Sequence, residues 1–163
     1  MEIKGKVFKY GDAVNTDVIL PGRWCHLYKP EDLKKHCLED LDKDFAANVE
    51  EGDIIAAGEN FGCGSSREVA PLSIKSSGIS AIIAKSFARI FYRNSINIGL
   101  PILESPEAVE NISAGNEVSV NMAEGTITNH TTGKTFNFVP FPEFMRDILA
   151  KGGIRDYILA KVK

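Results

Sequence analysis

The sequence contains few cysteines, and their spacing argues against two kinds of cysteine-based structure. Only three of the 163 residues are cysteine: Cys25, Cys37 and Cys63. An odd, widely spaced set does not make a disulfide framework. No C-x-x-C pair occurs, so the spacing typical of iron–sulfur ligands is missing as well. We therefore expect Cys25 and Cys37 to be packing residues and this chain to bind no metal by itself.

An excess of positive charge and long apolar segments are also absent. The formal net charge is −3, whereas a general nucleic-acid-binding protein carries a basic face. No apolar run reaches the length that crosses a membrane. The first five residues do not begin the apolar segment of a signal peptide. We expect a cytoplasmic protein that binds neither nucleic acid nor membrane.

The length and composition predict one globular domain, residues 1–163. The chain is 44% hydrophobic and 25% charged, and it is long enough to bury a substantial core. Short apolar runs alternate with helical patterns in its middle third. We predict strands at 53–57, 79–85 and 100–103, and helices at 69–77 and 87–96. This alternation is typical of a parallel α/β sheet.

The two ends of the chain complete the prediction. The last third favours an antiparallel meander followed by two helices. The predicted elements are a first strand at 3–10, a loop at 11–28, a helix from Pro30, strands at 117–121, 126–128 and 134–139, and helices at 142–150 and 154–161. The expected fold is a single-domain α/β fold with both parallel and antiparallel pairing.

Residues 58–68, GENFGCGSSRE, follow a buried apolar run and precede a helical pattern. Their glycines allow the backbone to approach a ligand closely, and a helix start offers unpaired N–H donors to an anion. Ser65, Ser66 and Arg67 add two hydroxyls and a guanidinium at that point. A carboxylate or phosphate could bind here. The alternative is a tight turn in which a serine caps the helix while Arg67 and Glu68 form a solvated pair.

Residues 60–68 resemble the signature of the small subunits of the aconitase-type hydro-lyases, specifically the isopropylmalate isomerase (3-isopropylmalate dehydratase) family. Other segments resemble the same family in the same order along the whole chain. They are residues 5–12, 15–23, 44–46, 84–94 and 97–101. Several collinear motifs are far more specific than one glycine-rich turn. The resemblance implies the swivelling β/β/α fold of the aconitase C-terminal domain.

The resemblance also implies a reaction and a partner. The family isomerises 2-isopropylmalate and 3-isopropylmalate through 2-isopropylmaleate in leucine biosynthesis. The [4Fe–4S] cluster of such an enzyme would belong to a separate large subunit, so we expect a heterodimer or heterotetramer and no activity from this chain alone. The alternatives are a related hydro-lyase subunit, of dimethylmalate dehydratase or homoaconitase, and a non-catalytic anion-binding module.

The resemblance assigns roles to the polar residues of the glycine-rich turn. Ser65 matches the serine that acts as the base, and Ser66 and Arg67 match residues that bind a substrate carboxylate. A planar guanidinium suits this role, because it grips a carboxylate at two points. The alternative role for Ser65 is helix capping, and both roles are compatible.

The resemblance also assigns supporting roles to residues that precede the turn and to glycines within it. Thr16 and Asp17 match a Thr-Asp pair of the family, in which Asp17 could orient Arg67. The alternative is a turn-forming aspartate. Gly62 and Gly64 would let the backbone of the turn approach the substrate.

The segment after Pro-Gly-Arg is expected to select the substrate, because the family's segment there contacts the distinguishing substituent. Here it contains Trp24, His26, Leu27 and Tyr28. Homoaconitase-like members of the family have an arginine for the extra carboxylate at the place that matches His26. Trp24, Leu27 and Tyr28 offer apolar area suited to an isopropyl group, although protonated His26 could still bind a carboxylate. The alternative is that Trp24 and Leu27 only pack the loop.

Two arginines in the predicted helix 87–96 complete the set of candidates. Arg89 and Arg93 are four residues apart, so they share a helix face. They could face a partner or a substrate edge. We favour the alternative of solvated or structurally paired arginines.

Overall fold

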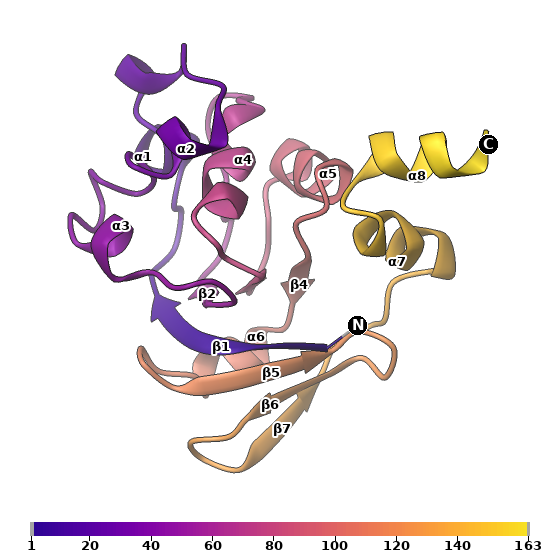
Figure 1. Ribbon diagram of the computed structural model, residues 1–163. Helices are drawn as coiled ribbons and strands as arrows, with labels where there is room; N and C mark the ends of the chain where they lie inside the picture. Colours follow the sequence, from indigo (N-terminus) through magenta and orange to yellow (C-terminus); the bar gives the residue numbers. More distant parts are fainter. Residues whose placement is uncertain (1, 163) are drawn as a thin grey trace.

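A seven-stranded mixed sheet organises residues 2–162, the part of the chain that the computed structural model describes (Figure 1). The strand order is β4-β3-β2-β1-β5-β6-β7. The strands are β1 Glu2–Lys9, β2 Ile54–Ala57, β3 Ala81–Ala84, β4 Ile102–Glu104, β5 Glu117–Asn121, β6 Thr126–Asn129 and β7 Lys134–Asn137. β1 to β4 pair in parallel and β1, β5, β6 and β7 pair antiparallel. The predicted mixed sheet is confirmed.

The first strand belongs to both halves of the sheet. Its residues 2–6 pair with β5, and its residues 7–9 pair with β2. All residues of β2 and β3 are buried. Strands covered on both faces are read as continuous apolar runs, which explains why these two were recognisable in the sequence.

Helices cover both faces of the parallel half. They are α1 Thr16–Ile19, α2 Pro30–Leu33, α3 Phe45–Asn48, α4 Val69–Ser76, α5 Arg89–Asn97, α6 Pro106–Glu110, α7 Glu143–Ala150 and α8 Ile154–Lys161, with a 3-10 turn at Gly22–Trp24. α6 lies apart from the other helices and contacts β3 and β7 (Figure 1). The sheet curls around α6, because β3 and β7 both contact this helix although four strands lie between them. Ser105 Oγ also donates to Asn137 O at 3.3 Å.

The structure corrects several predicted elements. The predicted loop 11–28 contains α1 and the 3-10 turn, and the predicted helix from Pro30 ends at Leu33. We did not predict α3 or α6. The signal for α6 was present, because Ser105 caps this helix by accepting from Ala108 N and Pro106 occupies its first position.

Pro71 has less effect on its helix than expected. We predicted a kink or a late start at this residue, but α4 begins at Val69. Pro71 is therefore in the first turn, where a backbone N–H has no intrahelical acceptor to lose.

The carboxyl ends of β1, β2 and β3 meet at one edge of the sheet and lead into three loops. Gly58 N donates to Gly11 O at 3.0 Å, which joins the first two loops. Lys85 N donates to Gly58 O at 3.1 Å, and Phe61 N donates to Ser86 O at 3.1 Å, which join the second and third. Ligands of parallel α/β sheets bind beyond this edge.

The glycine-rich turn packs closely against α5. The rings of Phe61 and Phe91 meet edge to face, with centroids 5.4 Å apart. Gly62 has φ +83°, and a Cβ at this residue would lie 2.1 Å from Phe91 Cγ. Only glycine fits both the backbone conformation and the contact.

Replacing Gly62 with alanine should therefore destabilise the fold more than the same change at Gly115, which has the same φ of +83° but open space where a Cβ would lie, with no atom within 4 Å. We expect the backbone strain at both sites to cost about 1–2 kcal/mol. The clash with Phe91 should add about 1–3 kcal/mol for Gly62→Ala alone. Urea unfolding of both variants measures the difference, and equal losses of stability would contradict the packing argument.

Candidate active site

A pocket of about 200 Å³ lies beyond the carboxyl edge of the parallel strands. Its walls come from the loop after β1, the glycine-rich turn after β2 and the first turns of α5 after β3. The lining residues are Thr16, Gly62, Gly64, Ser65, Ser66, Arg67, Ala88, Arg89, Ile90, Phe91 and Asn94. The structure thus brings together six of the residues that we assigned to the site from the sequence.

The glycine-rich turn leads directly into α4, which begins at Val69. The N-cap of α4 is Glu68, with no side-chain capping bond, so the alternative in which Ser65 or Ser66 caps this helix is wrong. Within residues 2–162, the backbone N–H groups of residues 64–68 donate to no protein acceptor. Both serine side chains are exposed. The turn therefore combines unpaired amides with two exposed hydroxyls beside the pocket.

The N-terminus of a second helix, α5, also borders the pocket, because its first residues, Arg89, Ile90 and Phe91, are lining residues. Its N-cap, Ala88, makes no side-chain capping bond, and the amides of residues 89–91 have no acceptor among the described residues. The first turn of a helix carries partial positive charge and favours a negatively charged ligand. Unpaired amides at the start of α5 therefore add to those of the turn that precedes α4.

Thr16 fixes the backbone of the turn at Ser65. Its side chain is buried, and Thr16 Oγ1 donates to Ser65 O at 2.8 Å. Thr16 N donates to Cys63 O at 2.9 Å. The carbonyl of Ser65 is thereby held toward the protein while its hydroxyl stays exposed.

Arg67 is anchored at the side of the pocket. Its Nη2 lies 2.6 Å from Asp17 Oδ1, and its Nη1 donates to Leu20 O at 3.2 Å. The expected contact between Asp17 and Arg67 is thus present, and the alternative pairing of Arg67 with Glu68 is not. This anchoring holds the guanidinium in place but occupies part of its donor capacity.

The segment expected to select the substrate does not line the pocket. Trp24 stacks on His36 with ring centroids 3.7 Å apart, and its indole N–H donates to Glu39. His26 and Tyr28 are exposed, and Leu27 is half-buried. One face of Trp24 is therefore occupied by packing, as in the alternative interpretation of this residue.

Glu39 anchors the start of this segment. Its carboxylate also binds the Arg23 guanidinium at 2.8 Å and lies 3.0 Å from His36 Nδ1. Burial raises the pKa of Glu39, but hydrogen bonds from His36, Trp24 and Arg23 outweigh that effect and lower the pKa below its usual range. Glu39 therefore remains an ionised anchor at neutral pH.

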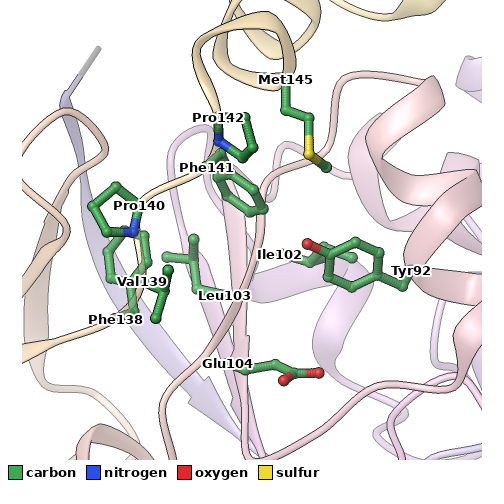
Figure 2. A pocket seen from close by; sticks show the side chains of 10 residues that line it. All are labelled: Tyr92, Ile102, Leu103, Glu104, Phe138, Val139, Pro140, Phe141, Pro142 and Met145. Carbon is green, nitrogen blue, oxygen red and sulfur yellow. The ribbon is translucent and has the colours of Figure 1, made fainter.

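A larger hollow, about 450 Å³, lies elsewhere between α5, β4 and residues 138–142 (Figure 2). Tyr92 and Glu104 are its polar side chains, and the other walls are apolar. Burial, followed by the charge of Glu104, raises the pKa of Tyr92, so the phenol stays protonated. This hollow offers neither a guanidinium nor an activated hydroxyl, and we place the site in the smaller pocket.

Metal-binding chemistry does not fit the residues of this chain. Across residues 2–162, no three His, Cys, Asp or Glu side chains are grouped as metal ligands. Cys37 is buried, whereas Cys25 and Cys63 are half-buried free thiols. In the same residues, no helix is long and apolar enough to cross a membrane.

Asn94 is a lining residue that we did not assign from the sequence, and Arg89 is one whose functional role we did not favour. The available signal was topological. Their helix follows β3, the neighbour of β2, and the carboxyl ends of adjacent parallel strands converge.

Comparisons with known proteins agree with this architecture. The sequence model of the family described as "Aconitase C-terminal domain" matches residues 26–108. The 3-isopropylmalate dehydratase small subunit of Caldicellulosiruptor bescii is 56% identical over 163 residues, which is 100% of this chain and 98% of that protein. The 2,3-dimethylmalate dehydratase small subunit of Eubacterium barkeri is 58% identical over 163 residues and 100% of both chains.

A solved structure shares the fold over nearly the whole chain. The crystal structure of 3-isopropylmalate dehydratase (LeuD) from Methanocaldococcus jannaschii has a TM-score of 0.94 and 44% identity, and covers 99% of this chain and 96% of that one. The curled sheet and the whole-chain identity lead to one conclusion. This chain belongs to the aconitase C-terminal domain family and, within it, to the family of dehydratase small subunits.

Proposed function

We propose that this chain is the small subunit of a hydro-lyase that interconverts 2-isopropylmalate and 3-isopropylmalate through 2-isopropylmaleate, a step of leucine biosynthesis. The observation that carries the proposal is the exposed hydroxyl of Ser65, which lies in a pocket between free backbone amides and the Arg67 guanidinium. Relatives named as 3-isopropylmalate dehydratase small subunits support the choice of reaction.

The reaction needs a base strong enough to remove a proton from carbon. The proton lies next to a carboxylate and is very weakly acidic, so the base we propose is the alkoxide of Ser65. Preorganised N–H donors stabilise developing negative charge. The free amides of residues 64–68 and the N-terminus of α5 provide such donors at this pocket. Ser66 and Arg67 bind a substrate carboxylate in this proposal.

The pocket is half of a complete site. Its volume of about 200 Å³ falls below the range of about 300–1,000 Å³ typical of ligand sites. We infer that a large subunit supplies the facing wall and carries the [4Fe–4S] cluster, since the residues described here do not fit one. When bound there, that cluster supplies Lewis-acid assistance to departure of the substrate hydroxyl. The chain alone is inactive in this proposal.

The substituent of the substrate is a separate question. Relatives named for isopropylmalate and for dimethylmalate are 56% and 58% identical to this chain, so overall identity does not discriminate between these substrates. We assign the choice to His26, Leu27 and Tyr28, which leave exposed surface for a substituent once a partner closes the site, as loops do over bound substrate. Trp24 holds this segment against His36.

A second candidate function is non-catalytic binding of an anion. The free amides of the glycine-rich turn favour it, because they suit phosphate as well as carboxylate. Titration calorimetry of the isolated chain with inorganic phosphate distinguishes the two. Saturable binding, together with no turnover after addition of a large subunit, would favour the binding module.

Replacement of Ser65 with alanine should abolish turnover by the enzyme reconstituted with its large subunit. We expect at least a 100-fold loss of kcat, because general bases contribute about 10²–10⁴-fold. The exposed side chain makes Ser65→Ala neutral for folding. Ser113→Ala, another exposed serine that lies outside the pocket, is the matched control. Retained turnover of isopropylmalate in the Ser65 variant would exclude it as the base.

His26→Arg should shift the enzyme toward substrates with an additional carboxylate. The new guanidinium would pair with that carboxylate, so the ratio of kcat/KM for homocitrate to kcat/KM for isopropylmalate should rise about tenfold, or about 1.4 kcal/mol. Ser113→Arg adds the same charge outside the segment and controls for net charge. An unchanged ratio in His26→Arg would remove this residue from substrate selection.

A further inference from the structure

Arg89 is a second guanidinium on the pocket that contains Ser65. It is the first residue of α5, and it lies in the wall contributed by that helix, whereas Arg67 belongs to the wall formed by the glycine-rich turn. We propose that Arg89 binds the second carboxylate of the substrate, while Arg67 binds the first. This inference rests on the proposed function, because it assumes a dicarboxylate in this pocket.

The charge of the ligand calls for two cationic groups. A hydroxy-dicarboxylic acid carries two carboxylates, and a guanidinium is the side chain best matched to each. Among the lining residues of this pocket, Arg67 and Arg89 are the cations. Arg67 already contacts Asp17 at 2.6 Å and Leu20 O at 3.2 Å, so only part of its fork remains for substrate.

Arg89 has its full donor capacity available. Its side chain is exposed, and it forms no ion pair with any carboxylate of residues 2–162. Asn94, about one turn further along α5, lines the same pocket and offers an amide donor. The backbone at Arg89 is fixed, because Ala88 N donates to Phe61 O at 2.9 Å. The fold therefore fixes where the Arg89 side chain begins relative to the turn.

Arg93 provides a matched comparison on the same helix. It is also exposed and also lacks a carboxylate partner among the described residues. It borders a neighbouring hollow with Arg89 and Ile90, but it does not line the pocket of Ser65. Both changes remove one exposed positive charge from α5, whereas only Arg89 lines the pocket of Ser65.

The experiment compares Arg89→Gln and Arg93→Gln in the complex with the large subunit. Each variant is assayed for isopropylmalate turnover, for affinity between subunits, and for inhibition by two substrate analogues in which one or the other carboxylate is a carboxamide. Loss of a charge-assisted hydrogen bond should raise KM for Arg89→Gln about 10- to 100-fold. The Arg93→Gln complex should keep the wild-type KM.

The analogues separate carboxylate binding from a general effect. Wild type should bind the two carboxamides more weakly than the dicarboxylate, whereas Arg89→Gln should no longer distinguish one of them from the dicarboxylate. If Arg89→Gln discriminates against both analogues as wild type does, or if it weakens only the affinity between subunits, the inference is overturned and Arg89 is a docking residue. If the wild-type complex does not dehydrate isopropylmalate, or Ser65→Ala does not impair it, the proposed function itself has failed.

Discussion

Backbone hydrogen bonds between two loops are the constraint on which this site depends. Ala13 N donates to Glu59 O at 2.8 Å, and Gly62 N donates to Val14 O at 2.8 Å. The contact of Thr16 with the carbonyls of Cys63 and Ser65 extends this pairing to the pocket. Backbone groups that are paired in this way need no water, so both loops can pack against the sheet edge with little freedom to move. The backbone that carries Ser65 gains its fixed position from this pairing.

This backbone pairing ends at Cys63, at the edge of the pocket. Beyond Cys63, the amides of the turn have no acceptor in the described part of the chain, and neither do those of the first turn of α5. Unpaired amides are costly when they are buried, but these two sets of amides border an open pocket that water can enter. An anionic ligand can replace that water with little rearrangement of the protein. The pocket is therefore preorganised for negative charge before any substrate arrives.

In the proposed function, the incomplete wall of the pocket explains how a small domain contributes to removal of a weakly acidic proton from carbon. This chain offers amides, hydroxyls and two guanidinium groups, with Arg67 held by Asp17. Its described residues offer no ligand set for a metal. In the proposed function the two halves of the site lie on two chains, so catalysis depends on their closure, which excludes water from a reactive intermediate. The segment that begins at Trp24 is held by Glu39 beside this opening rather than inside the pocket.

The sequence by itself determined the strands of the parallel half and the chemistry of the turn at residues 58–68. Continuous apolar runs between glycine-rich turns are strong local signals, and the collinear motifs indicated the family. Only the tertiary structure decided that the N-terminus of α5 joins the glycine-rich turn at the pocket, that Trp24 stacks on His36, and that Arg89 lines the same pocket as Ser65. These outcomes depend on contacts between segments far apart in the chain. The secondary-structure propensity of a short segment does not predict such contacts. The short helices α3 and α6 were missed for a related reason, since tertiary packing rather than periodicity stabilises helices of so few turns.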